Sequence, residues 1–177
     1  MKKLILTIII ILTAVSGSFA QNEAPGKSDK NTSIESSPLM AYFHYYAVRC
    51  NRSMTDNGDL LLGFAYLNTK WADQGRLHAY TLLTGYRYYL WRGLHAEYEL
   101  WSAYDPFESS VDGKTYKGVD FWHAVRAGYR FMFDCGSFDP YIIFQVEVGR
   151  GLKRFNKWPE YKNHTSVHPI LLVGVRF

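Results

Sequence analysis

The last stretch of the chain, Ser166–Phe177, alternates between two kinds of side chain and ends on an aromatic residue. Steps of two back from the end meet only apolar residues: Phe177, Val175, Val173 and Leu171. The opposite face carries Arg176, Gly174, Leu172 and Ile170. Successive side chains of a β-strand point to opposite faces, so this segment predicts a strand that is apolar on one side only. An arginine on the other face is typical of a barrel wall that separates lipid from a lumen filled with polar side chains.

Turn signals divide the rest of the chain, from Leu39 onward, into further strand-like runs. Short turns at Arg92-Gly93 and Asp134–Ser137 alternate with long polar loops at Asp105–Gly118 and Lys153–Thr165. The predicted strands are Leu39–Arg49, Leu60–Trp71, Arg76–Trp91, Leu94–Tyr104, Val119–Phe133, Pro140–Leu152 and Ser166–Phe177. Single-chain bacterial barrels use an even number of strands, so we expect an eighth, either within Asn31–Pro38 or hidden in a merged pair elsewhere. The sequence therefore predicts an all-β fold, an antiparallel transmembrane β-barrel of eight strands.

Charged residues recur on one face of these predicted strands. On Leu94–Tyr104, for example, Glu97 and Glu99 share a face with His95 and Trp101. An Arg or Lys on the lipid face would cost about 2–4 kcal/mol near the midplane, so we expect the charged faces to point inward. Buried charges must pair there, and an Arg fork matches carboxylates. The predicted lumenal charge network is Arg87, Glu97, Glu99, Arg126, Arg130, Glu147 and Arg176, with Gln145 and His95 beside it.

This network has two interpretations. An eight-stranded barrel is only wide enough for its own side chains, which favours a salt-bridged plug. A catalytic or ion-conducting group is the alternative. The same alternation puts His78, His123 and Arg150 on the outward face, where long side chains near a rim can reach lipid headgroups.

The N-terminus has the pattern of a secretory signal peptide. Lys2 and Lys3 precede an apolar run of about 12 residues, too short for a bilayer span of roughly 20. Small residues then lead to Ala20, so we expect cleavage near Ala20, with an uncleaved helical anchor as the alternative. We expect a signal peptide at residues 1–20, a polar segment at 21–38 with room for a short first strand, and the barrel at 39–177. Loss of Lys2 and Lys3 takes the net charge from +4 to +2, a balance that argues against nucleic acid as a partner.

One short motif recurs near the ends of three alternate strands. It has the pattern Gly-x-Arg-aromatic. The three copies are Gly85-Tyr86-Arg87-Tyr88, Gly128-Tyr129-Arg130-Phe131 and Gly174-Val175-Arg176-Phe177. Strands that run in the same direction meet the same interface and need similar residues, which we favour as the explanation, with an internal duplication as the alternative. An aromatic content of 17%, with 14 Tyr, fits the interfacial girdles of membrane barrels.

Through its leader, these strand ends and the terminal Val173–Phe177, the chain resembles small bacterial outer-membrane β-barrel proteins of the OmpA-transmembrane and OmpX type. The resemblance implies an eight-stranded barrel without a cofactor. It also implies that Val173, Val175 and Phe177 belong to a signal read by the barrel-assembly machinery. Its implied roles are envelope integrity, adhesion through the outer loops, or narrow gated conductance. The implied partners are outer-membrane lipids, lipopolysaccharide and an extracellular ligand at the outer loops.

Candidate catalytic chemistry is sparse in this sequence. His164 and Ser166 have a spacing similar to the His/Ser pair of outer-membrane lipid A deacylases, but no acidic residue follows them. His164 and His168 lie too far apart on an extended stretch to chelate a metal ion, so we expect neither a metal site nor a cofactor. Cys50 and Cys135 are expected to be free thiols, with a periplasmic disulfide as the alternative.

We therefore expect a non-enzymatic outer-membrane protein with a structural, adhesion or envelope-integrity role. Two alternatives remain: a lipid A-modifying enzyme of deacylase or acyltransferase type, and a narrow gated pore. A soluble lipocalin-like barrel would enclose an apolar lumen, which is the reverse of the polarity expected here.

Overall fold

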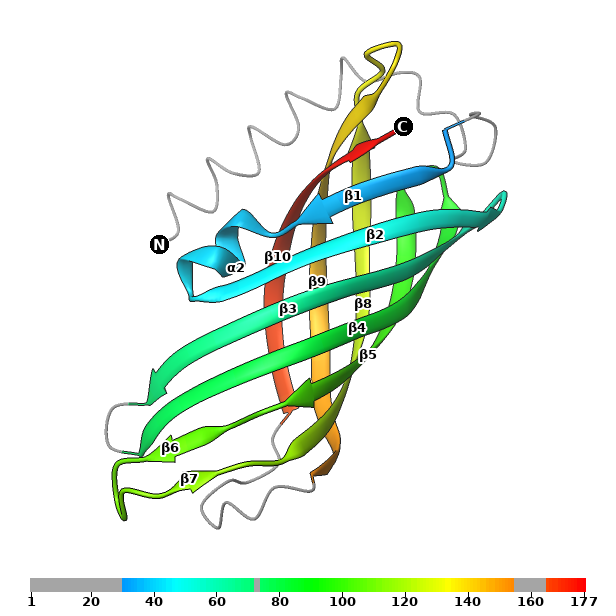
Figure 1. The fold of residues 1–177 in the computed structure, drawn as a ribbon. Helices are drawn as coiled ribbons and strands as arrows, with labels where there is room; N and C mark the ends of the chain where they lie inside the picture. The colour runs from blue at the N-terminus through cyan, green and yellow to red at the C-terminus, as the bar shows by residue number, and fades with distance from the viewer. Residues whose placement is uncertain (1–29, 72–73, 155–164) are drawn as a thin grey trace, which may run out of the picture.

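Eight antiparallel strands close into a barrel in the computed structural model, which describes residues 30–71, 74–154 and 165–177 (Figure 1). Strand β1 pairs with both β2 and β10, and this double pairing closes the ring. The strands of the wall are β1 (Thr32–Ser36), β2 (Tyr45–Thr55), β3 (Gly58–Trp71), β4 (Gly75–Trp91), β5 (Leu94–Tyr104), β8 (Val119–Met132), β9 (Asp139–Arg154) and β10 (Thr165–Arg176). The predicted all-β, eight-stranded antiparallel barrel is confirmed.

The first two strands differ from the prediction. The eighth strand is β1, within the expected range 31–38, whereas the predicted strand Leu39–Arg49 is wrong in its first half. Helix α2 (Pro38–Tyr42) occupies that half, and β2 follows it. Ser37 caps the helix by accepting the Met40 N–H at 3.3 Å, and Pro38 needs no partner at the first helical position. In the described part of the chain, no helix has the length and apolar character needed to cross a membrane.

Both described chain ends lie at one end of the barrel, which we call the terminal end (uppermost in Figure 1). Phe177 and Thr32 exchange two backbone hydrogen bonds, at 2.9 and 3.2 Å. The opposite end, here the loop end, carries a hairpin of β6 (Phe107–Ser109) and β7 (Thr115–Tyr116). The predicted loop Asp105–Gly118 thus contains two short strands that extend the wall beside β4.

Gly75 allows this hairpin to dock on β4. It has φ 143°, and a Cβ there would come within 1.9 Å of the Glu108 carbonyl oxygen. The contact holds Phe107, which is fully buried, against Leu77. Only glycine satisfies both the positive φ and the close approach.

Substitution Gly75→Ala is therefore expected to destabilise the fold by about 1–3 kcal/mol and to release the hairpin. Limited proteolysis between residues 105 and 118 should become faster. Gly113→Ala is the matched control, because Gly113 has φ 69° with nothing within 4 Å of its Cβ position. Equal proteolysis of the two variants would contradict a docking role for Gly75.

Candidate functional site

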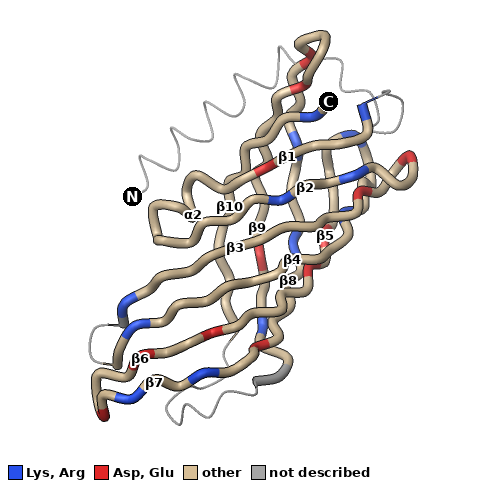
Figure 2. Tube along the Cα trace, in the orientation of Figure 1, with Lys and Arg blue, Asp and Glu red and all other residues tan. Residues whose placement is uncertain are grey.

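The lumen is lined by a row of charged residues that face one another across neighbouring strands. Register pairs Asp59 with Arg87, Arg87 with Glu97, Glu97 with Arg126, Arg126 with Glu147, and Glu147 with His168. The row alternates in sign across β3, β4, β5, β8 and β9 and ends at His168 on β10. Figure 2 shows basic and acidic positions along the strands of the barrel. Opposite charges directly across a strand pair stabilise the sheet, so the inward face of each strand supports its neighbours.

The middle of this row, with residues from β1 and β2, forms the central cluster. It comprises Glu35, Arg49, Arg87, Glu97, Glu99, Arg126 and Glu147, none of them more than 5% exposed. Each guanidinium binds two or three carboxylates. Arg49 contacts Glu35, Glu97 and Glu99 at 2.8, 2.8 and 2.9 Å.

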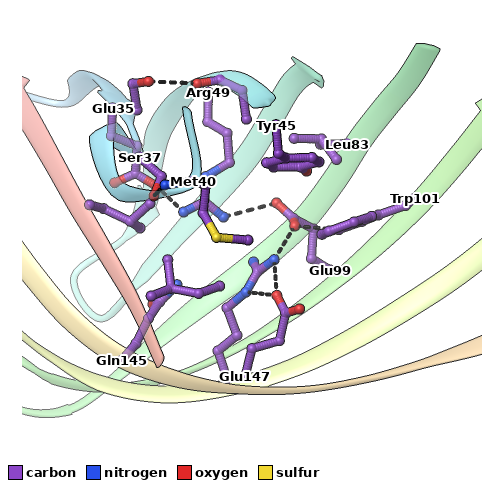
Figure 3. A pocket seen from close by; sticks show the side chains of 15 residues that line it. Glu35, Ser37, Met40, Tyr45, Arg49, Leu83, Glu99, Trp101, Gln145 and Glu147 are labelled. Carbon is purple, nitrogen blue, oxygen red and sulfur yellow. Dashed lines mark hydrogen bonds and ion pairs between the residues drawn. The ribbon is translucent and has the colours of Figure 1, made fainter. Parts of the chain in front are cut away.

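The other two arginines complete the central cluster. Arg87 binds Glu35 at 2.8 Å and Glu97 at 2.7 Å. Arg126 contacts Glu97, and it binds Glu99 at 2.7 Å and Glu147 at 2.6 Å. Figure 3 shows Arg49, Glu99 and Glu147 converging from different strands. Removing such charges from water is compensated only when several good partners surround each one.

Aromatic groups complete the coordination of the carboxylates. The Trp101 indole donates to Glu99 at 2.5 Å, and the Tyr141 hydroxyl donates to Glu35 at 2.9 Å. Four carboxylates face three guanidiniums, and His168 lies 3.0 Å from Glu147 as the nearest further base. The acids and bases are thus occupied by one another, which leaves the central cluster suited to holding strands together rather than to reacting.

A second group, the terminal cluster, lies in the lumen near the chain ends. Asp59 accepts hydrogen bonds from the Tyr89 hydroxyl at 2.8 Å and from Ser53 at 2.7 Å. Arg130 reaches Asp59 at 3.4 Å and lies over the Tyr89 ring, 4.3 Å from its centroid. The remaining members are Asp139, Arg176 and Lys30, with Asp139 at 3.6 Å from Arg176 and 2.5 Å from Lys30.

All seven residues of the predicted lumenal charge network lie inside the barrel, each at most 6% exposed. The structure brings Arg87, Glu97, Glu99, Arg126 and Glu147 together in the central cluster and puts Arg130 and Arg176 in the terminal cluster. Sequence reasoning missed Glu35, Arg49, Asp59 and Asp139. Asp59 and Asp139 lie just before two predicted strands, so extending each strand by one residue would have found them.

The remaining candidates lie elsewhere. Ser166 is half-buried on β10, while His164 lies outside the described residues. Cys50 and Cys135 are exposed free thiols, and Cys50 lies within β2 rather than at its end. His78, His123 and Arg150 are on the outward face, where the Tyr66 hydroxyl and His78 Nδ1 are 2.9 Å apart. In the described part of the chain, no group of three or more His, Cys, Asp or Glu could hold a metal ion.

The outer wall has the opposite character to the lumen. Its exposed side chains include Leu60, Leu62, Phe64, Leu82, Leu90, Val125, Phe144, Val146, Val148 and Val173. Four tyrosines on adjacent strands, Tyr46, Tyr66, Tyr80 and Tyr104, are register neighbours toward the loop end of this surface. A contiguous apolar surface on this scale marks an interaction with a partner or a membrane.

The fold and both charge clusters therefore define a barrel with a polar interior and an apolar exterior. Comparisons of the chain with protein-family models, with curated proteins and with solved structures find no match.

Proposed function

We propose that the protein is a non-enzymatic bacterial outer-membrane β-barrel with a structural, adhesion or envelope-integrity role. The observation that carries this proposal is the inverted polarity of the barrel. Charged side chains such as Glu97 and Arg126 are buried, whereas Phe64 is 71% and Val146 is 53% exposed on the outer wall. Water would favour the reverse arrangement, and a bilayer favours this one.

The dimensions of the apolar surface support the same location. On β4 the outward positions from Tyr80 to Leu90 span ten residue steps. At about 3.3 Å per residue and a tilt of about 40°, this corresponds to a height of about 25 Å, which matches the apolar band of outer-membrane barrels. The row of four tyrosines then lies at the outer interface, where such barrels carry aromatic girdles.

The central and terminal clusters act as a plug in this proposal. Each guanidinium of the central cluster has at least two carboxylate partners, so opening a water path would break several buried ion pairs together. A narrow gated pore is the alternative. The enzymatic alternative rests on the spacing of His164 and Ser166 alone.

In the proposed orientation, the terminal end of the barrel faces the periplasm and the loop end faces the cell exterior. This orientation determines which partners each part of the barrel would contact. The barrel would contact outer-membrane lipids and lipopolysaccharide, and the loop end would present any contact surface for an extracellular ligand. Val173 and Val175 lie on the outward face of β10 and the exposed Phe177 directly follows the strand, where the barrel-assembly machinery could read them.

The test is the gel mobility of the mature protein from the outer-membrane fraction, with and without boiling. A folded membrane barrel resists detergent, so we expect a shift in mobility only after boiling. An unshifted protein in the soluble fraction would contradict the proposal and require the exposed apolar wall to be an interface with protein. Lipid A of unchanged mass in a strain that expresses the protein would separate the structural role from the enzymatic alternative.

A further inference from the structure

The outward face of β3 and β4 changes in character step by step toward the loop end. Its register pairs are Phe64 with Leu82, Tyr66 with Tyr80, Asn68 with His78, and Lys70 with Arg76. The series therefore runs from apolar through aromatic and polar to basic side chains. We call these eight residues the graded face. Figure 2 shows basic positions side by side at the loop ends of the two strands.

The last pair of the graded face puts two cations directly opposite each other. Lys70 and Arg76 are both exposed, and like charges in directly opposite positions destabilise a strand pair. Glu108 of β6 is the register neighbour of Arg76 on its other side. The ion pairs of the described chain lie in the lumen or within the hairpin, and none involves Lys70 or Arg76. An anion bound between the two side chains would remove their repulsion.

His78 supplies a third donor next to this pair. The Tyr66 hydroxyl lies 2.9 Å from His78 Nδ1, and the two rings stack, which orients the imidazole. A protonated imidazole donates from both nitrogens, to Tyr66 through Nδ1 and to a further acceptor through Nε2. Three positive groups against one carboxylate, that of Glu108, leave two positive charges. A phosphate monoester, with a charge of about −1.5 to −2 near neutral pH, matches this balance and the planar fork of Arg76.

The height of these donors on the barrel corresponds to a lipid headgroup layer. In the proposed orientation, Tyr80 marks the loop-end limit of the apolar band. At about 3.3 Å per residue and a tilt of about 40°, His78 lies about 5 Å and Arg76 about 10 Å beyond Tyr80. The polar layer of one leaflet is about 5–8 Å thick, and long basic side chains can bend toward it. The donors are therefore at the level of phosphate groups, and the apolar pair is at the level of acyl chains.

We propose that the graded face binds an amphiphile with a phosphate monoester head and an acyl chain, on the loop-end side of the membrane. The basic pair and His78 bind the phosphate. The tyrosine pair lies at the level of the ester groups, and the acyl chain lies along Phe64 and Leu82. This inference rests on the proposed membrane location, and it adds to that location a defined site with a preferred head group.

The experiment counts lipids bound to the folded barrel by native mass spectrometry. The protein, in a neutral detergent, is titrated with phosphatidic acid, whose head is a phosphate monoester, and separately with phosphatidylcholine, whose head has no net charge. We expect one phosphatidic acid to be retained at a concentration at which phosphatidylcholine is not. Lys70→Gln and Arg76→Gln should each weaken the apparent affinity about fivefold, the upper range for an ion pair near a surface.

Arg52→Gln is the matched control. Arg52 is an exposed, outward-facing cation of β2 toward the terminal end, and its register neighbours Thr32 and Leu60 are uncharged. This variant loses the same charge, so we expect the affinity of the parent protein. Equal weakening by Arg52→Gln and Arg76→Gln would overturn the site and indicate a general attraction between a basic protein and an anionic lipid.

Glycerol 3-phosphate tests whether the occupant is a lipid, because it carries the same head without acyl chains. We expect no displacement of phosphatidic acid at equal concentration. Displacement at equal concentration would overturn the lipid assignment in favour of a free phosphate ester. Equal retention of phosphatidylcholine and phosphatidic acid would overturn the assignment of a phosphate monoester head.

Insertion into phosphatidylcholine vesicles, measured on the same preparations, separates this inference from the proposed function. A parent protein that fails to insert would overturn the membrane location. An inserted parent barrel without a preference for phosphatidic acid would overturn the graded face as a lipid site and leave the membrane location intact. The boiling-dependent gel shift verifies that each variant is folded.

Discussion

Arginine in place of Val146 is expected to destabilise the membrane-inserted barrel. Val146 lies on the outward face of β9 between Ala127 on β8 and Pro169 on β10, and it is 53% exposed. In water an exposed valine can become arginine at little cost. Near the middle of a bilayer the same change costs about 2–4 kcal/mol, because the guanidinium must leave water or deform the lipid around it.

The measurement is the folded fraction after refolding into lipid vesicles, followed across a urea titration. Val111→Arg is the matched control, since Val111 is 64% exposed in the hairpin at the loop end, away from the apolar wall. We expect a lower urea midpoint for Val146→Arg and an unchanged midpoint for Val111→Arg. Two unchanged midpoints would place the apolar wall in water or against a partner protein.

The barrel itself could be predicted from sequence because side-chain alternation has a period of two in every strand. From Leu60 onward, the alternation of apolar and polar side chains distinguished the two faces of each strand. There the strand-like runs are long, and Gly or Asp marks the turns between them. It failed near α2, because the apolar run Leu39–Phe43 satisfies either a helix or a strand. Ser37 and Pro38 carried the helix start signal, which the apolar run obscured.

The same error explains why Glu35 and Arg49 were missed. Arg49 points inward only once β2 is known to run from Tyr45 to Thr55, and Glu35 requires the position of β1. Which acid meets which base depends on register between strands distant in sequence, such as β1 with β10. Composition and alternation carry no information on that pairing. The end of β1 at Ser36 was likewise beyond prediction, because it depends on how far β1 pairs with β2 and β10.

Loss of Arg126 is expected to cause the largest destabilisation of any single change in the lumen. Arg126 contacts Glu97, Glu99 and Glu147, all buried, and no other cation of the described chain touches all three. Arg126→Leu would leave four carboxylates facing two guanidiniums in the central cluster. Removal of one partner from a buried ion pair costs about 3–5 kcal/mol, because the remaining charges stay out of water without compensation.

The complementary change, Glu147→Gln, should be much milder. It leaves three carboxylates with three guanidiniums, and the amide oxygen can still accept from Arg126. We expect a cost of about 1–2 kcal/mol, close to that of one weakened hydrogen bond to a charged group. Lys114→Ala provides the surface control, since Lys114 lies 3.9 Å from Asp112 in an exposed pair that contributes little to stability.

Urea titrations of the three variants in vesicles should therefore rank Arg126→Leu as the least stable, then Glu147→Gln, then Lys114→Ala. Single-channel recordings of the same proteins address the plug directly. Because Arg126 joins β8 to carboxylates on β5 and β9, its loss should also raise the conductance of the barrel, whereas Lys114→Ala should not. A stable, non-conducting Arg126→Leu barrel would mean that packing of the lumen, rather than its ion pairs, closes it.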